Sequence, residues 1–223
     1  TNLAAAAAEL GRRVLLIDAD PQGAAGNFLG ADVSKPTLYD TLHGAPAAAA
    51  VRPTDVERLD LIPADLDLAA ADLELGALDG WQTLLRRRLD EVAARYDLLL
   101  VDVGPGLTPL THAALHAVDA VLLVVRLRYG DLRGMNYGLD AVARAGRATL
   151  GVLPNMVGRR TVHQQAVLDE IAKISGTRAL APIPERVAIP DAQAAGRPII
   201  AHEPSSDVAE TFRDLAKEVL RRA

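Results

Sequence analysis

The chain has 223 residues, of which 50% are hydrophobic, 24% charged and only 3% aromatic. This is the balance of an ordinary globular protein, and the scarcity of aromatic residues predicts a core of aliphatic side chains and alanine. A net charge of −5 argues against nucleic-acid binding through bulk charge alone. The absence of cysteine excludes disulfides, thiolate metal sites and iron–sulfur clusters.

The sequence shows no membrane-spanning or secretory signal. No apolar run approaches the roughly 20 residues needed to cross a bilayer, and no signal peptide is visible. We therefore expect a cytoplasmic protein without a membrane partner. Its length suits one sizeable domain.

The first half of the chain alternates between helical and strand patterns. It opens with an alanine-rich helix that Gly11 is expected to end. The spacing of apolar residues then predicts a series of elements, in the order strand 13–18, helix 38–43, strand 59–63, helix 66–75 and helix 81–95.

The second half continues the alternation and ends in an amphipathic helix. Its elements are predicted as strand 97–103, helix 109–117, strand 119–125, helix 131–145, strand 148–153, helix 162–174, a short strand 179–183 and helix 207–220. In the last helix, Val208, Phe212, Leu215 and Val219 form an apolar stripe that we expect to pack into the core.

These elements predict the fold class. Strands that are apolar throughout and alternate with helices indicate an α/β fold with a doubly wound, mostly parallel sheet and helices on both faces. No repeat or long linker divides the chain, so residues 1–223 are expected to form a single domain.

Acidic residues follow two of the apolar strands. The run 14–17 leads into Asp18 and Asp20, and the run 98–101 leads into Asp102. Because open α/β sheets bind ligands at the carboxyl ends of their strands, these acids mark a candidate site. Hydrated Mg²⁺ is a common partner for such carboxylates, so neighbouring strand ends could hold one metal–phosphate group between them. The alternative is that each acid merely caps the turn or helix that follows it.

The run Leu16-Ile17-Asp18-Ala19-Asp20-Pro21-Gln22-Gly23 resembles the second signature of the ParA/Soj-like partition ATPases, the deviant-Walker group of P-loop NTPases. The resemblance extends in order over nearly the whole chain. It includes the first helix (2–5 and 9–14), the Walker B strand (96–102), the nucleotide-base region (151–156, 159–161 and 183–184) and the C-terminal segment (196–200 and 216–220).

The resemblance implies a P-loop NTPase fold, ATP and Mg²⁺ as cofactors, and a homodimer that segregates chromosome or plasmid DNA with a ParB-like partner. It also implies association with the nucleoid. Asp20 would position the attacking water, Asp18 would support the metal shell and Asp102 would hold Mg²⁺ through water. Asn155 would read the adenine edge, and Pro184 would shape the base pocket.

The family's phosphate loop, of pattern K-G-G-x-G-K-T, should lie about ten residues before Asn2, and residues 1–223 do not contain it. The strand that leads into this loop, which is central in the fold, is also not among them. We therefore expect an N-terminally incomplete domain that, as written, neither binds ATP tightly nor hydrolyses it. The intact protein is expected to be an ATPase if it carries the loop; a truncated sequence and a natural loss both remain open.

Two other functions stay open. One is a non-catalytic ParA-like scaffold, which the lack of a glycine–lysine loop in the DNA upstream of Thr1 would favour. The other is a metabolic P-loop ligase of the dethiobiotin-synthetase type, against which the Asp-Pro-Gln-Gly loop and the C-terminal segment speak. A neighbouring ParB-like gene would decide between the partition protein and the ligase.

Weaker signals concern DNA and metal. The arginine runs at 86–88, 159–160 and 221–222 are either phosphate contacts for non-specific DNA or solvated helix faces. Glu185-Arg186 and Ala188 depart from the family's usual residues, which puts DNA binding by the usual surface in question. His112 and His116 have the i, i+4 spacing of metal ligands, but zinc is not expected because no third ligand is near in sequence.

Overall fold

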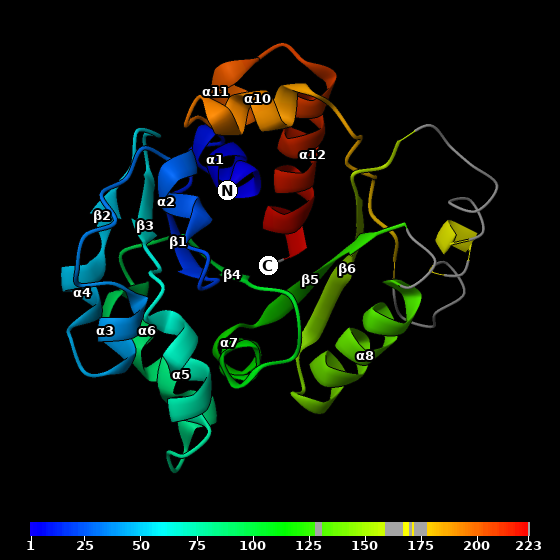
Figure 1. Cartoon of the computed structure of the whole chain (residues 1–223). Coiled ribbons are helices and arrows are strands. Elements are labelled where there is room, and N and C mark those ends of the chain that lie inside the picture. The colour runs from blue at the N-terminus through cyan, green and yellow to red at the C-terminus, as the bar shows by residue number, and fades with distance from the viewer. Residues whose placement is uncertain (128–130, 159–166, 170, 172–177, 223) are drawn as a thin grey trace.

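The computed structural model describes residues 1–127, 131–158, 167–169, 171 and 178–222. Helices and strands alternate along most of the chain (Figure 1). The strands are β1 (Val14–Ala19), β2 (Arg52–Pro53), β3 (Leu59–Ile62), β4 (Leu98–Val103), β5 (Ala120–Arg126) and β6 (Ala148–Asn155). The helices are α1 (Asn2–Glu9), α2 (Ala24–Phe28), α3 (Leu38–Leu42), α4 (Ala47–Ala50), α5 (Leu68–Leu75), α6 (Leu84–Ala93), α7 (Pro109–Ala117), α8 (Asp131–Arg144), α10 (Ala188–Ala194), α11 (Ile199–His202) and α12 (Asp207–Arg222), with a 3₁₀ turn η1 (Trp81–Thr83) before α6.

Most of the predicted elements are confirmed to within a few residues. The sequence did not predict α2, α4, β2, α10 or α11, because elements this short carry too little periodicity to recognise. The predicted strand 179–183 is wrong: Ala179 makes an isolated parallel bridge with Val152, and Pro184, one residue beyond the predicted strand, makes another with Val157. Proline has no backbone N–H, so Pro182 and Pro184 cannot donate to a continuous ladder. Most of the predicted helix 162–174 lies outside the described residues.

The strands form two sheets. One has the order β2-β3-β1-β4, in which β1 is parallel to both β3 and β4 while β2 is antiparallel to β3. The other pairs β5 with β6 in parallel. The prediction of a mostly parallel sheet is confirmed, but the sheet is interrupted between β4 and β5.

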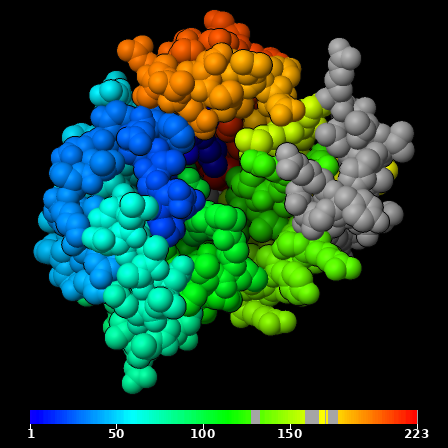
Figure 2. Space-filling view, viewed as in Figure 1, coloured from blue at the N-terminus to red at the C-terminus, as the bar shows by residue number. Residues whose placement is uncertain are grey.

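The interruption changes how the strands are buried. All six residues of β1, which has a neighbour on each side, are buried, whereas the apolar residues 98–101 of β4 are only half-buried. Figure 2 shows a hollow at the centre of the face turned toward the viewer, between the blue residues and the green ones.

Helices cover both faces of the larger sheet. Val14 and Leu16 of β1 face one cluster that includes α1 and α12. Leu15 and Ile17 face a second cluster built with α3, α5, α6 and α7. This alternation is the doubly wound arrangement that the sequence predicts.

Alanine provides much of the core beside β1. Residues 4–8 of α1 are all alanine, and each is at most 4% exposed. The small side chains let α1 lie close to β1 and α12, which confirms a core built from aliphatic residues and alanine.

The C-terminal helix packs as predicted. Val208, Leu215 and Val219 of α12 are buried, and Phe212 packs against the same cluster. Arg213 also joins α12 to α1 through an ion pair with Glu9 at 2.7 Å. Over the ranges that the structure describes, no helix is both long and apolar enough to span a membrane.

Candidate functional site

Asp18, Asp20 and Asp102 come together at the carboxyl ends of β1 and β4. Asp18 and Asp102 are paired in register across these strands, so their Cα atoms are separated by roughly 4.8 Å, the spacing of neighbouring strands. The carboxylate of Asp20 lies against Gly104 in the loop after β4, where a Cβ on the glycine would be 3.3 Å from Asp20 Cγ. The three acids therefore border one site.

Asp18 is the buried member of the group, with 2% of its surface exposed. One carboxylate oxygen accepts a hydrogen bond from the backbone N–H of Asp20 and the other from that of Ala25, both at 3.1 Å. Burial raises the pKa of Asp18 to about 6, although the two backbone hydrogen bonds act in the opposite direction. The carboxylate of Asp18 thus connects the turn after β1 to the start of α2. This is the role expected if the acid caps the turn and helix that follow it.

Residues 20–23 form a tight turn, here called the Asp20 turn. The N–H of Gly23 donates to the carbonyl of Asp20 at 2.9 Å, and Pro21 occupies the position where its fixed φ suits such a turn. Asp20 Oδ1 accepts from the N–H of Gln22 at 2.9 Å. Gly23 has φ +60, and a Cβ there would lie 3.0 Å from the carbonyl oxygen of Ala64. The turn therefore requires glycine at this position.

Asp102 is exposed at the end of β4. A carboxylate in this position is accessible to a hydrated cation, which is how Mg²⁺ is commonly held beside phosphates. In the part of the chain that the structure describes, no three His, Cys, Asp or Glu side chains are grouped so that they could hold a metal ion. The acids therefore fit Mg²⁺ that brings water and phosphate ligands with it, and not an all-protein metal site.

Asn155 and Pro184 lie on neighbouring segments beside the smaller sheet. Asn155 ends β6, and its Oδ1 accepts from the N–H of Met156 at 2.9 Å. Pro184 follows Ile183, whose N–H donates to the carbonyl of Pro154 at 2.9 Å. None of the three acids lies on the smaller sheet that contains Asn155. Residues 159–161, the rest of the predicted base region, are outside the described residues.

Two of the three arginine runs make ion pairs in the described part of the structure. Arg221 and Arg222 both pair with Glu218 of the same helix, so this run stabilises α12. Arg86 lies 3.8 Å from Asp119. His112 and His116 lie on α7 and belong to no metal-binding group among the described residues.

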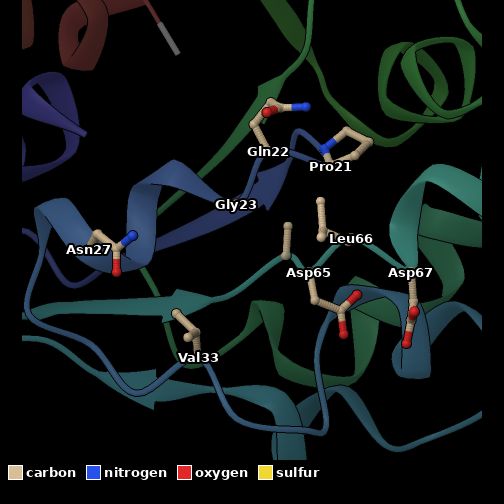
Figure 3. Close-up of a pocket in the computed structure, with 9 residues that line it drawn as sticks. Pro21, Gln22, Gly23, Asn27, Val33, Asp65, Leu66 and Asp67 are labelled. Carbon is tan, nitrogen blue, oxygen red and sulfur yellow. The ribbon is translucent and has the colours of Figure 1, made fainter.

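The structure also contains a pocket that the sequence did not reveal, beside residues 21–23 of the Asp20 turn. Its volume is about 380 Å³. Figure 3 shows it between this turn and the loop that joins β3 to α5. It is lined by Pro21, Gln22, Gly23, Asn27, Val33, Ala64, Asp65, Leu66 and Asp67. No local pattern predicts it, because its walls come from segments some 40 residues apart in sequence.

Parallel strands with helices on both faces and acids at adjacent strand ends define an α/β fold with a candidate ligand site at its strand ends, and the structural neighbours described below place it in the P-loop NTPase class. Comparison with known proteins gives the family. The AAA domain family matches residues 1–149. The chain is 38% identical to the sporulation initiation inhibitor protein Soj of Bacillus subtilis over 98% of this chain and 90% of the relative. It is 34% identical to the chromosome partitioning protein ParA of Caulobacter vibrioides over 99% of this chain and 87% of the relative.

A solved structure supports the same class. Cobyrinic acid a,c-diamide synthase from Mycobacterium smegmatis with bound ADP and magnesium superposes with a TM-score of 0.84 at 30% identity, covering 99% of this chain and 87% of the other. The chain belongs to the ParA/Soj family of chromosome-partitioning ATPases.

Proposed function

We propose that this protein is a ParA-like, ATP-dependent switch that dimerises with nucleotide bound and partitions chromosome or plasmid DNA with a ParB-like partner. Non-specific DNA is a further partner in this proposal, and the nucleoid in the cytoplasm is its place of action. Membership of the Soj/ParA family supports the assignment. So does the bound ADP and magnesium of a structurally similar protein.

The observation that carries the proposal is the meeting of Asp18, Asp20 and Asp102 at one edge of the sheet. Phosphoryl transfer depends mainly on positioning and electrostatic stabilisation, so few protein groups are needed, but each must be held in place. The buried Asp18 supplies such rigidity, because both of its oxygens hold the backbone around the Asp20 turn.

Each acid then has a distinct role. Asp20 orients the attacking water from a turn that packs against the loop after β4. Asp102, exposed at the neighbouring strand end, would hold hydrated Mg²⁺, and the ion would supply positive charge beside the phosphates. Asp18 supports this arrangement as a positioning residue. Asn155 and Pro184 contribute to the base pocket.

ATP hydrolysis by the protein expressed from its complete reading frame tests the proposal. We expect slow turnover, stimulated by DNA and the ParB-like partner, and a loss of at least about a hundredfold in Asp20→Ala, since water positioning of this kind is worth two to four orders of magnitude. Asp119→Ala is a matched control, because the Asp119 side chain is 93% exposed, and it should retain full activity. Absence of ATP binding by the complete protein would instead support the non-catalytic scaffold.

One observation favours a second function. The similar Mycobacterium smegmatis structure is described as a synthase of a metabolite, which keeps the metabolic ligase as a candidate. The chromosome partitioning protein ParA of Caulobacter vibrioides has a higher sequence identity, 34%, and this favours the partition function. A deletion strain distinguishes the two: chromosome or plasmid loss in rich medium supports partitioning, whereas a nutrient requirement with normal segregation supports the ligase.

A further inference from the structure

The amino ends of the parallel strands carry arginines that the proposed nucleotide site does not use. Arg13 directly precedes β1, Arg58 directly precedes β3, and Arg95 lies between α6 and β4. Because β1 runs parallel to both β3 and β4, these arginines lie at the edge of the sheet opposite to Asp18 and Asp102. The two edges are separated by the length of β1, roughly 20 Å.

The arginines line a small pocket, here called the arginine recess. Its volume is about 140 Å³, and its walls are Arg13, Arg58, Asp60, Arg95 and Tyr96. Pockets that enclose a whole metabolite usually have a volume of about 300 Å³ or more. The arginine recess is therefore suited to a small ion or to a single group of a larger molecule.

The carboxylates at this edge already have partners. Asp97 accepts hydrogen bonds from Arg13 Nε at 3.2 Å and Nη2 at 2.7 Å, and this pairing lowers the pKa of Asp97 to about 2. Asp60 Oδ2 accepts from the hydroxyl of Tyr96 at 2.8 Å. Burial and this hydrogen bond raise the pKa of Tyr96 to about 12, so the hydroxyl stays neutral. Arg13 is thus neutralised, whereas Arg58 and Arg95 are left to face the recess.

Arg95 has no carboxylate of its own. Among the residues that the structure describes, no ion pair joins its guanidinium to an Asp or Glu. The guanidinium carbon instead lies 5.6 Å from the centre of the Tyr96 ring, in a cation–π contact. The N–H groups of a guanidinium lie in its own plane, so this contact leaves them free to donate to an acceptor.

Arg58 has an unusual backbone conformation. Its φ is +66, in the left-handed region that glycine adopts readily and longer side chains rarely do. Its Nη1 donates to the carbonyl of Gly11 at 3.0 Å, which holds the guanidinium at the edge of the sheet. Its ion pair is a 3.5 Å contact with Glu57, whose side chain is 89% exposed. Strain of this kind is characteristic of functional positions, and here it holds a cation beside a recess.

We propose that the arginine recess binds a phosphate ion or the phosphate group of a small phosphomonoester. Arg58 and Arg95 supply the positive charge, and their N–H groups donate to the phosphate oxygens. Two charge-assisted interactions support a dissociation constant on the order of 1 mM. A nucleic-acid backbone is a poorer occupant. The recess admits only one group, and Glu57 and Asp97 beside it repel a polyanion.

Bound phosphate would connect the segments that lead into β3 and β4, the two neighbours of β1. A ligand that binds only the folded state stabilises it, so phosphate should also raise the resistance of the protein to urea. The site needs no nucleotide and does not depend on the proposed function.

Calorimetric titration with inorganic phosphate at constant ionic strength tests the site. The protein is expressed from its complete reading frame, and ADP and Mg²⁺ are present so that phosphate does not enter a nucleotide site. We expect binding near 1 mM, and Arg95→Gln should weaken it at least about tenfold, the loss for one charge-assisted hydrogen bond. Equal binding of glycerol phosphate would show that the recess accepts an ester, and binding of inorganic phosphate alone would show that its ligand is the free ion; both support the proposal. Failure of the protein to bind ADP would contradict the proposed function and leave the phosphate titration unchanged.

Arg58→Gly separates phosphate binding from folding. Glycine adopts a positive φ without strain, so this variant should keep its stability in urea while its phosphate binding weakens at least about tenfold. Arg133→Gln/Arg144→Gln is the matched control, because both arginines are exposed on α8, and it should bind phosphate as the unsubstituted protein does.

Three results would overturn the proposal. The first is equal weakening in the control, since binding would then be general attraction to arginine. The second is the absence of binding up to about 10 mM phosphate, ten times the expected constant, or unchanged binding in Arg58→Gly and Arg95→Gln. The third is displacement of the phosphate by duplex DNA, because the recess would then belong to a nucleic-acid surface.

Discussion

The charge on Asp18 should cost the folded state stability at neutral pH. Its pKa rises from 3.8 to about 6 on folding because the carboxyl is buried. This rise corresponds to about 3 kcal/mol of stability. Since the folded pKa is the higher one, the penalty is absent below pH 4, grows between pH 4 and 6, and is constant above.

Asp18→Asn isolates this penalty. Asparagine cannot ionise, and its single amide oxygen can accept only one of the two backbone N–H groups that Asp18 now accepts. The lost hydrogen bond lowers stability by an amount that does not depend on pH. We therefore expect the free energy of unfolding of the variant, relative to the unsubstituted protein, to rise by about 2–3 kcal/mol between pH 4 and pH 7.5.

Urea unfolding followed by circular dichroism, in EDTA and without nucleotide, measures this difference at each pH. Asp32→Asn is a control of opposite sign, because hydrogen bonds from Ser34 lower the pKa of Asp32. Its stabilising charge is present above the unfolded pKa and is lost as the pH falls. A difference between Asp18→Asn and the unsubstituted protein that stays constant from pH 4 to 7.5 would refute the reasoning.

Three further predictions concern the turn, a hydrogen bond and the nucleotide. Gly23→Ala should lower the free energy of unfolding by more than Gly80→Ala does in urea melts. Both residues have positive φ, which costs alanine about 1–2 kcal/mol. Only at Gly23 does a carbonyl oxygen lie 3.0 Å from the new Cβ. Equal losses would contradict the packing of the Asp20 turn. Tyr96→Phe removes a 2.8 Å hydrogen bond to Asp60 and should cost about 1–2 kcal/mol in the same melts, whereas Tyr137→Phe, 67% exposed, should cost nothing measurable. Calorimetry on the polypeptide of residues 1–223 should detect no micromolar ATP binding, because these residues include no glycine–lysine loop; a micromolar affinity would show this expectation to be wrong.

Local sequence patterns determined the elements and the residues at their ends. The apolar run before Asp18 and the one before Asp102 each specify a strand, and an acid that follows such a run lies at its carboxyl end; the first strand is buried and the second half-buried. The Asp-Pro-Gln-Gly sequence specifies the Asp20 turn, since proline fixes φ at its second position and glycine accepts positive φ at its fourth. These features depend on neighbours a few residues away, so the sequence carries them directly.

Only the tertiary structure decided which elements meet. The pairing of β1 with β4 places Asp18 beside Asp102, and the packing of two loops places Asp20 against Gly104. The same is true of the interruption between β4 and β5, and of the outward side of α5 that leaves Leu66 and Leu73 exposed. Strand order and the choice of buried helix face depend on contacts between residues far apart in the chain, and hydrophobic burial is non-directional, so an apolar pattern alone cannot specify its partner.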